Sequence, residues 1–369
     1  MRVESVRSTT CRIPLTRPIV MGDLRFEARE YLVVEIRTDE GIVGTGFGMT
    51  RDAPLGAILD RTIAWRLIGA DPMLTEAIWT ALYDANLTVG QRGLFMRCLS
   101  AVDIALWDIK AQVAGLSLWQ LLGGARQTVP AMIAGGYPRD GTTLAMLEAE
   151  VGEEAAAGFG VIKIAAGDLR DDTARLRVAD GARGASRLAY DVHWAWRRLA
   201  DVLPTVRRWA DLDLAFIEDP FPSESPRLAA ELRARTGIPL ALGEDVTGRY
   251  AYRDLLEQAP PDQLRVDATT AGGISEVLKI CALAATASIP VLPHIFPEVH
   301  VHLGAALPIV AAVEVTNPDR EIDLFWRLLE DPIRSVDGVL TAPLRPGLGA
   351  SIDQAALARF AVERLVTPA

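Results

Sequence analysis

The chain has 369 residues, which is too long for one small domain and fits a large domain with an accessory one. Hydrophobic residues make up 50% and charged residues 23%, and the formal net charge is −10. This composition is that of a globular protein with a sizeable core, and it excludes an extended basic surface for nucleic acid.

We expect neither a secretory leader nor a membrane segment in this sequence. Cys11, Cys98 and Cys281 are far apart and fit neither a metal site nor a disulfide framework, so we expect a reducing cytoplasm. The N-terminal run MRVESVRSTT lacks the apolar centre of a signal peptide. The longest uncharged run, Ile280–Pro297, contains three prolines and is typical of a helix end followed by a strand. We therefore expect no membrane partner.

The first part of the chain predicts an antiparallel sheet. Val3–Arg12 and Glu30–Thr38 alternate between apolar and polar residues, Asp39–Gly41 predicts a turn, and Ile42–Gly48 predicts the returning strand. Leu15–Phe26 is rich in proline, glycine and arginine, and we expect a loop there.

Helices are predicted next, at Ala57–Ile68, Leu74–Ala85 and Gly93–Ala114. The last of these is amphipathic, with a hydrophobic stripe along one side. Gly115, followed by Gly123 and Gly124, marks the end of this region.

Two short motifs in the chain carry little chemical information. The GTGFG run at 44–48 resembles a nucleotide-binding loop, but no helix follows it, so we interpret it as a tight turn between strands. His300 and His302, with Glu298 nearby, lie at the start of a predicted helix or loop. Histidines two residues apart do not share a helical face, so a zinc site is not indicated.

From about Thr128 the pattern changes to eight strand-like runs separated by helical stretches such as Thr143–Ala157, Leu228–Thr236 and Ser275–Ala287. The runs are VPAMIAGG, GVIKIAAG, RLAYDVHW, LAFIEDPF, IPLALGED, LRVDATTAGG, IPVLPHIF and AAVEVT. Eight such units predict an α/β fold, a (β/α)8-type (TIM-like) barrel. We place an N-terminal α+β domain at 1–125, the barrel with its site residues at 126–342, and at 343–369 a C-terminal tail that packs back on the first domain.

Three carboxylates follow three successive barrel strands. Asp191 ends RLAYD, Glu218 ends LAFIE and Glu244 follows IPLALG, with gaps of 27 (218 − 191) and 26 (244 − 218) residues. Active sites of such barrels lie at the carboxyl ends of the strands. Three converging carboxylates suit a hard divalent cation, Mg²⁺ before Zn²⁺. Alternatively, single acids at strand ends begin helices or solvate loops.

Further polar residues occupy the ends of other strands. Asp267 and His294 follow neighbouring strands, so they can form a hydrogen-bonded pair that acts as a general base or acid. Lys163 lies inside the apolar run VIKI, where a lysine is costly unless it is paired or functional. Glu314, if protonated, could donate to an oxyanion. His193 lies two residues beyond Asp191, on the same face of an extended strand. It is a possible acid, substrate contact or metal neighbour.

These residues lie in motifs that resemble those of the enolase superfamily, specifically its mandelate racemase-like subgroup, over nearly the whole chain. Ser100–Gly124 looks like the signature helix of the family's capping domain. The barrel motifs occur in the family's order: IEDP (Ile217–Pro220), GED (Gly243–Asp245), DATTAGGISE (Asp267–Glu276) and PHIF (Pro293–Phe296). The resemblance identifies residues 1–125 as an α+β capping domain.

The resemblance also implies roles. The three strand-end acids would bind Mg²⁺, and catalysis would begin with removal of a proton α to a carboxylate, giving a metal-stabilised enolate. Asp267 and His294 would form the catalytic dyad, Glu314 would stabilise the enolate oxygen, and Lys163 would lie near the substrate carboxylate. The resemblance further implies a homo-oligomer.

Two departures from the family pattern bear on the reaction. On the strand that carries Lys163, the family usually has a second lysine two residues later, and here that position is Ala165. His193 stands where many relatives carry asparagine. One strong base favours a Mg²⁺-dependent sugar-acid dehydratase that converts an aldonate or aldarate to a 2-keto-3-deoxy acid. An epimerase or racemase, a lactone cycloisomerase and a non-catalytic binding barrel are the alternatives. Substrate contacts are expected from the loops at 15–26 and 48–57, with Arg17, Asp23 and Arg25 as candidates.

Overall fold

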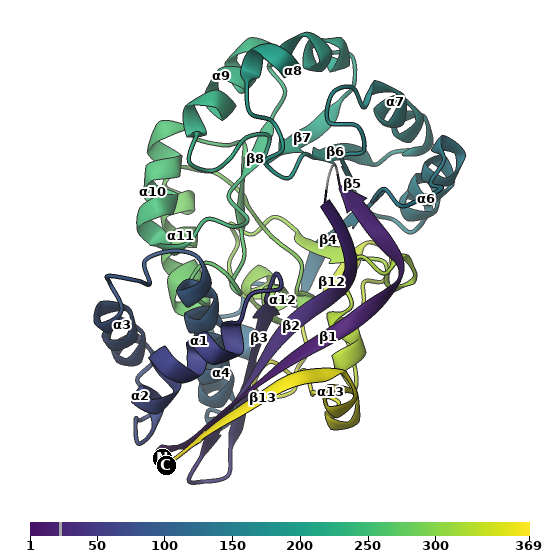
Figure 1. Cartoon of the computed structure of the whole chain (residues 1–369). Helices are drawn as coiled ribbons and strands as arrows, with labels where there is room; N and C mark the ends of the chain where they lie inside the picture. The colour runs from purple at the N-terminus through teal and green to yellow at the C-terminus, as the bar shows by residue number, and fades with distance from the viewer. Residues whose placement is uncertain (22–23) are drawn as a thin grey trace.

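The computed structural model describes residues 1–21 and 24–369, and its first sheet joins both ends of the chain (Figure 1). The strands of this antiparallel sheet lie in the order β13-β1-β2-β3. Their bounds are β1 Val3–Met21, β2 Leu24–Thr38, β3 Val43–Met49 and β13 Ala361–Pro368. Because β13 pairs with β1, the last strand lies against the first.

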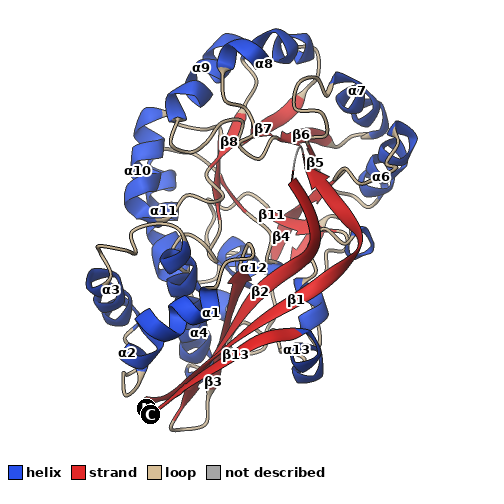
Figure 2. Cartoon of the chain, in the orientation of Figure 1, coloured by secondary structure: helices blue, strands red, loops and turns tan. Residues whose placement is uncertain are grey.

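Helices pack beside this sheet (Figure 2). They are α1 Leu55–Leu59, a π-helical turn Asp60–Ala64, α2 Trp65–Leu67, α3 Thr75–Ala85, α4 Leu94–Val113 and α5 Leu118–Leu121. The predicted helices at 74–85 and 93–114 are confirmed to within a residue at each end. The predicted helix at 57–68 is three consecutive helical segments, with the π-helical turn in the middle.

The expectation of a loop at 15–26 was wrong for its described residues. Strands β1 and β2 continue into this region, and Ile19 pairs with Phe26. The ladder is irregular between Pro14 and Ile19, which explains why the alternation is weak in the sequence. Contacts with the barrel keep the segment extended: Ile19 is buried, and the Val20 amide donates to the Pro138 carbonyl (2.8 Å). Asp23 lies outside the described residues.

The predicted returning strand at 42–48 is confirmed as β3, so the interpretation of GTGFG within it as a tight turn was wrong. A Cβ atom on Gly44 would lie 2.1 Å from the Ala105 carbonyl oxygen, and one on Gly46 would lie 1.8 Å from that of Ala101. The glycines therefore let the backbone of α4 approach the strand directly.

Eight parallel strands form the predicted barrel, in the order β10-β9-β8-β7-β6-β5-β4-β11. Their bounds are β4 Thr128–Gly135, β5 Val161–Ala165, β6 Arg187–Asp191, β7 Leu214–Glu218, β8 Leu240–Leu242, β9 Gln263–Val266, β10 Val291–Pro293 and β11 Val313–Thr316. Two backbone hydrogen bonds, from the Val291 amide to Ile309 and from the Ala311 amide to Val291, nearly close the barrel (3.0 and 2.9 Å).

Helices surround the barrel strands (Figure 1). They are α6 Leu144–Ala156, α7 Thr173–Ala182, α8 Leu199–Val206, α9 Pro226–Thr236, α10 Gly248–Gln258, α11 Ile274–Thr286 and α12 Pro297–Ala306, with 3-10 turns at Arg207–Trp209, Pro318–Arg320 and Phe325–Leu328. After the barrel, β12 (Val339–Thr341) pairs antiparallel with β4, and α13 (Gln354–Phe360) precedes β13. Residues two positions before the strand-end polar groups, such as Ala189, Phe216 and Leu292, pack together in one hydrophobic cluster.

Hydrogen bonds fix the N-terminal domain against the barrel. Asp103 on α4 accepts hydrogen bonds from the amide and hydroxyl of Ser275 at the start of α11 (2.8 and 2.7 Å). Trp107 donates to the same hydroxyl (2.8 Å), and the Ser100 hydroxyl accepts from the Gly272 amide (2.8 Å). These contacts hold the capping residues in place relative to the strand ends.

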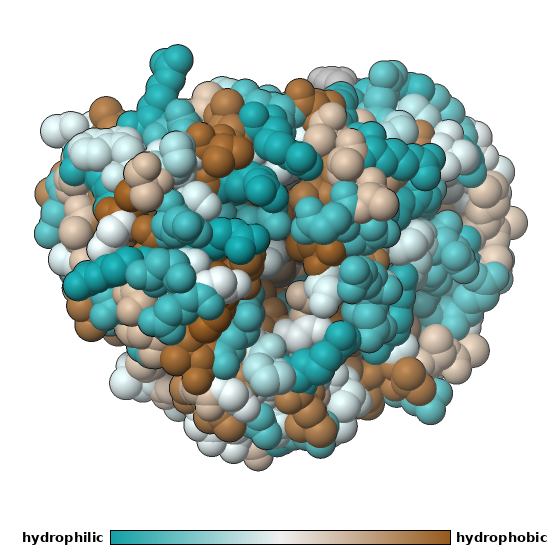
Figure 3. Space-filling model, turned by 90° about the horizontal axis from the view of Figure 1, so that it is seen from below, coloured by the Kyte–Doolittle hydropathy of each residue, from teal (hydrophilic) through white to brown (hydrophobic). Residues whose placement is uncertain are grey.

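Hydrophilic residues cover much of the face seen in Figure 3, and hydrophobic ones lie in small separate groups. Among the described residues, no helix combines the length and the apolar character that a bilayer crossing requires.

Candidate active site

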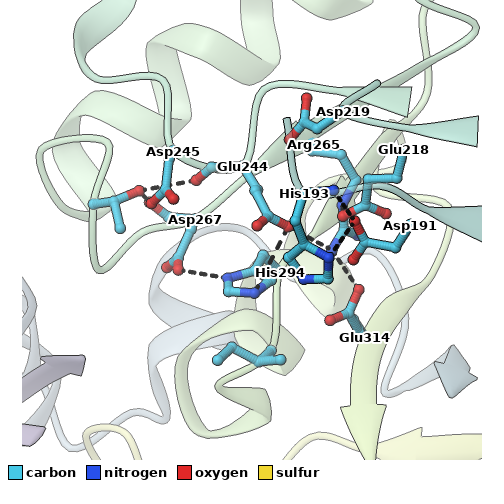
Figure 4. A network of polar contacts seen from close by, with 12 residues as sticks. Asp191, His193, Glu218, Asp219, Glu244, Asp245, Arg265, Asp267, His294 and Glu314 are labelled. Atoms are coloured by element: carbon cyan, nitrogen blue, oxygen red, sulfur yellow. Dashed lines mark hydrogen bonds and ion pairs between the residues drawn. The ribbon is translucent and has the colours of Figure 1, made fainter. Parts of the chain in front are cut away.

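Three buried carboxylates converge at the carboxyl ends of the barrel strands (Figure 4). Asp191 ends β6, Glu218 ends β7, and Glu244 lies two residues after β8. One oxygen from each lies within 4.8 Å of the others, and the side chains are at most 2% exposed. The parallel strands bring these acids together because their carboxyl ends meet at one edge of the barrel.

Two buried cations lie beside these acids. Lys163 Nζ lies 3.0 Å from Asp191, 2.9 Å from Glu218 and 2.9 Å from Glu314. Arg265 donates to Glu218 through Nε (3.1 Å) and also contacts Glu314. Four carboxylates against two cations leave two negative charges uncompensated when all the groups are ionised.

The arrangement of the acids fits a hard divalent cation. The Oδ2 atom of Asp191 and the Oε2 atoms of Glu218 and Glu244 are buried without a hydrogen bond, although Lys163 faces the first of them. Burial raises the pKa of Glu218 well above its usual range, although Arg265 and Lys163 oppose this shift. Buried oxygens without donors are costly, and a cation of charge 2+ would satisfy both their coordination and the excess charge.

Glu314 lies in the same cluster. Burial raises its pKa, yet Arg265 and Lys163 outweigh burial and hold the pKa at about 2. Donation to an oxyanion requires a protonated carboxyl group, so that role of Glu314 stays a prediction. Arg265 and Lys163 are the hydrogen-bond donors here.

Asp267 and His294 are hydrogen-bonded to each other. His294 Nδ1 lies 3.0 Å from Asp267 Oδ2, and its Nε2 lies 3.7 Å from Glu244 (Figure 4). Burial lowers the pKa of His294, but Glu244 and Asp267 outweigh burial and raise the pKa to about 9. Since Nδ1 faces Asp267, Nε2 is the ring nitrogen available to a substrate.

Asp267 is held in turn by its neighbours. The Thr269 amide donates to its Oδ1 (2.7 Å), and His300 on α12 lies 3.7 Å from the same oxygen. His300 itself accepts from the Ala268 amide (2.9 Å), and His302 hydrogen-bonds the Leu348 carbonyl (2.9 Å). Both histidines are buried in the helix and bonded to backbone.

His193 contacts the acids, but it does not continue the strand. Strand β6 ends at Asp191, and His193 adopts a left-handed backbone with φ of 52°, so the expected extended conformation was wrong. Its amide and Nδ1 both lie close to Asp191 Oδ1 (3.1 and 3.2 Å). These contacts turn the imidazole toward the acid cluster.

Left-handed non-glycine residues gather around the site. They are Arg51, Asp52, His193, Trp194, Asp219, Ile295 and Phe296. Such conformations cost free energy and persist only where surrounding contacts enforce them, which is common at functional sites.

A narrow cavity of about 40 Å³ lies over the two site histidines. Its lining residues are Phe26, Arg29, Met49, Arg51, Tyr137, His193, His294, Ile295, Ile322 and Asp323. It adjoins a wider cavity of about 460 Å³, with which it shares Tyr137 and Ile322. Ala165 is buried in register with Asp191 and supplies no titratable group.

The sequence analysis missed several of these residues. Arg265 lies two residues before Asp267 on β9, and this same-face spacing in an apolar strand was a signal that could have identified it. Arg29 and Arg51 carry no such signal. Of the arginines expected at the substrate, Arg17 lines only the wider cavity and Arg25 pairs with Asp140 (2.9 Å).

Two family descriptions match this chain. "Mandelate racemase / muconate lactonizing enzyme, N-terminal domain" matches residues 5–123, and "Enolase C-terminal domain-like" matches residues 146–356.

Individual relatives are similar over nearly the whole chain. D-galactarolactone cycloisomerase of Agrobacterium fabrum is 35% identical, covering 98% of this chain and 99% of the relative. L-talarate/galactarate dehydratase of Salmonella typhimurium is 30% identical, covering 96% and 90%. The crystal structure of L-talarate dehydratase from Polaromonas sp. JS666, complexed with Mg and L-glucarate, is 31% identical with a TM-score of 0.89, covering 100% and 99%. The chain therefore belongs to the mandelate racemase/muconate lactonizing enzyme family of the enolase superfamily.

Proposed function

We propose that the chain is a Mg²⁺-dependent dehydratase of a sugar acid, an aldonate or aldarate, and forms a 2-keto-3-deoxy acid. The observation that carries the proposal is a single histidine base. His294 is oriented by Asp267 beside the acid cluster, and alanine occupies position 165, where the family's second lysine usually lies. A β-elimination needs one base and one acid, whereas a two-base racemisation needs a base on each face of the α-carbon.

Asp191, Glu218 and Glu244 would hold the metal, since their unbonded oxygens converge. When bound, Mg²⁺ supplies positive charge beside the substrate carboxylate and so makes the α-hydrogen more acidic. L-talarate dehydratase, which is similar in structure, was solved with Mg and L-glucarate. Lys163 lies 3.0 Å from Asp191 and would place a positive charge near the substrate carboxylate.

His294 would move the protons. Its Nδ1 faces Asp267, and Glu244 is the main cause of its raised pKa. A metal on Glu244 would offset that charge, and once the ring has lost its second proton, the lone pair on Nε2 can accept the α-proton. The protonated ring can then donate to the departing 3-hydroxyl, which leaves as water, and the enol product takes a proton at C3 on becoming the 2-keto acid. His193 lines the same cavity and is the second candidate donor to the leaving hydroxyl.

Lactone cycloisomerisation is the second candidate function. It also requires one base and one acid, and the relative that is 35% identical over 98% of the chain is named D-galactarolactone cycloisomerase. In that reaction the ring oxygen of a lactone leaves instead of a hydroxyl group, so the ring opens and no water is released.

Turnover in D2O with Mg²⁺ separates these reactions. A panel of sugar acids and their lactones should yield a 2-keto-3-deoxy acid with deuterium at C3, largely on one face, by NMR. Recovered starting acid should show little inversion at C2. Accumulation of the C2 epimer without keto acid would replace the dehydratase with an epimerase, and turnover of lactones alone would favour the cycloisomerase.

A further inference from the structure

Two arginine side chains line the narrow cavity with guanidinium nitrogens that have no partner among the described residues. Arg29 on β2 is 7% exposed, its Nε donates to the Ile322 carbonyl (2.7 Å), and its guanidinium lies over the Phe26 ring. Its terminal nitrogens form no hydrogen bond or ion pair with residues 1–21 or 24–369. Arg51, just after β3, is exposed and likewise has no partner in that part of the chain.

The sheet brings these two arginines to one place. Tyr31 pairs with Met49 across β2 and β3. Arg29 precedes Tyr31 by two residues and Arg51 follows Met49 by two, so both lie at the same end of the same strand pair. Both come from the capping domain and line the cavity over His193 and His294.

The loop that carries Arg51 is held in a strained shape. Arg51 and Asp52 both have left-handed backbones, with φ of 55° and 58°. Arg12 binds the Asp52 carboxylate (2.6 Å), the Asp52 amide donates to the Thr50 hydroxyl (3.2 Å), and that hydroxyl donates to Glu30 (2.7 Å). These contacts enforce the conformation that keeps Arg51 at the cavity.

The two guanidinium groups are close enough to repel. Burial lowers the pKa of Arg29, and the charge of Arg51 lowers it further. The Asp323 carboxylate, which also lines the cavity, acts in the opposite direction, but it already accepts hydrogen bonds from the Tyr31 hydroxyl and the Phe325 amide. An anion between the two guanidinium groups would offset their mutual repulsion.

Other arginines nearby are already bonded. In the wider cavity, Arg17 donates to the Asp140 carbonyl (2.7 Å), and Arg139 donates to the carbonyls of Arg17 and Arg320. Arg327 pairs with Glu321. Arg320 pairs with Glu153, although its Nε has no partner. Among the described arginines that line the two cavities, Arg29 and Arg51 are the ones whose terminal nitrogens are all without a partner.

We propose that Arg29 and Arg51 bind a second carboxylate at the far end of the substrate, so that the enzyme prefers dicarboxylic sugar acids (aldarates) over monocarboxylic aldonates. This inference rests on the proposed dehydratase function. A substrate with one carboxylate at the acid cluster and its α-carbon at His294 extends its other end toward the capping domain. Guanidinium groups bind carboxylates through paired, charge-assisted hydrogen bonds, and an uncharged hydroxymethyl group cannot replace that contact.

Matched substrates test the inference. Galactarate against galactonate and D-glucarate against D-gluconate differ only at C6, and kcat/KM with Mg²⁺ should favour the diacid of at least one pair. Arg51→Gln should lower kcat/KM for that diacid by roughly tenfold to a hundredfold and leave the monoacid nearly unchanged. Arg29→Gln should act in the same direction. Arg327→Gln is the matched control, because its guanidinium in the wider cavity is already paired with Glu321, and it should leave the ratio unchanged.

Two outcomes overturn the inference while leaving the dehydratase intact. One is a wild-type preference for the monoacids. The other is an Arg51→Gln variant that slows both acids by the same factor, which would place the guanidinium on a shared hydroxyl or on the first carboxylate. Circular dichroism melting curves establish that the variants are folded.

If no sugar acid is dehydrated, the proposed function fails, and calorimetry then decides the inference separately. With Mg²⁺ present, the wild-type protein should bind the diacid of a pair more tightly than the monoacid, and Arg51→Gln should abolish the difference. Equal binding of the two acids by the wild-type protein overturns the inference.

Discussion

Among single residues, Glu218 is a carboxylate that both buried cations of the site contact. Its side chain is fully buried, and one oxygen is bonded by both Lys163 (2.9 Å) and Arg265 (3.1 Å). The other oxygen has no hydrogen bond. One oxygen is thus neutralised by protein cations, and the other is free to coordinate a metal.

Changing Glu218 to Gln keeps the shape of the side chain and removes one negative charge. We expect Mg²⁺ affinity measured by calorimetry to fall by more than about tenfold, since even partners that only orient metal ligands contribute about 10- to 100-fold. Turnover should be lost and the fold retained. Glu276→Gln is the control, because this buried carboxylate pairs with Arg249 away from the cluster. Unchanged Mg²⁺ affinity in Glu218→Gln would contradict the metal assignment.

The dyad makes a second prediction at this scale. His294→Asn should remove keto-acid formation almost entirely, because Ala165 supplies no second base on β5. Asp267→Asn should slow turnover by several orders of magnitude, because the imidazole is no longer held in the correct tautomer. The same change in a comparable carboxylate–histidine pair costs about 10⁴-fold. Both are measured by steady-state kinetics on the natural substrate. Near-normal turnover by His294→Asn would mean that the base has been misassigned.

How well single residues could be predicted depends on what places them. The three acids and the dyad follow strand ends, and parallel strands of a barrel converge by geometry alone, so the sequence was sufficient to bring them together. Arg29 and Arg51 reach the cavity through the pairing of β2 with β3 and through its packing over the barrel. That arrangement is tertiary, and a local pattern in the sequence does not encode it.

At the scale of elements, β3 and α4 approach each other most closely: among the described glycines, Gly46 of β3 has the shortest distance from an ideal Cβ position to a neighbouring atom. The ideal Cβ position of Gly46 lies 1.8 Å from a backbone oxygen of α4, and backbone cannot move aside as a flexible side chain can. Strand and helix therefore depend on each other for their packing.

Gly46→Ala should consequently destabilise the protein by at least about 3 kcal/mol, as severe overpacking does. Urea denaturation measures the effect. Gly181→Ala in α7 is the matched control: its Cβ would meet nothing within 4 Å, so we expect no loss and a gain of up to about 1 kcal/mol. Equal stabilities for the two variants would show that the close approach is not required.

Elements with strong periodicity were predictable. The barrel strands and the helices at 75–85 and 94–113 follow from alternation and amphipathic spacing. The extension of β1 and β2 was not, because Pro14 and Pro18 and an irregular register disguise it, and contacts with the barrel hold it extended. Strand β3 was predicted from its place after the turn at 39–41, but the GTGFG run within it was misread as a tight turn because its glycines serve packing.

For the whole molecule, the burial of Glu298 predicts how stability depends on pH. Its side chain is 3% exposed at the start of α12, and burial raises its pKa to about 8. The unfolded chain releases this proton near its ordinary pKa, about 4.5. Between these values the folded state holds more protons, so stability falls as pH rises through the window, and the loss is complete above about pH 8.

Glu298→Gln removes the titration. Relative to the wild-type protein, the variant should gain stability between pH 5 and pH 9, on the order of a few kcal/mol. Thermal or urea unfolding at both pH values measures the difference. Parallel pH profiles for the two proteins would show that Glu298 is ionised in the folded state throughout this range.

The pairing of β13 with β1 has a consequence for the order in which the molecule is assembled. Val6 pairs with Thr367, so the ladder joins positions 361 residues apart (367 − 6). During synthesis, the N-terminal strands wait with an open edge while every barrel strand is made. The barrel can close around its own core first. The antiparallel sheet that places Arg29 and Arg51 then receives its outer strand, β13, last. Newly made chains are therefore expected to hold a formed acid cluster before they hold a finished substrate pocket.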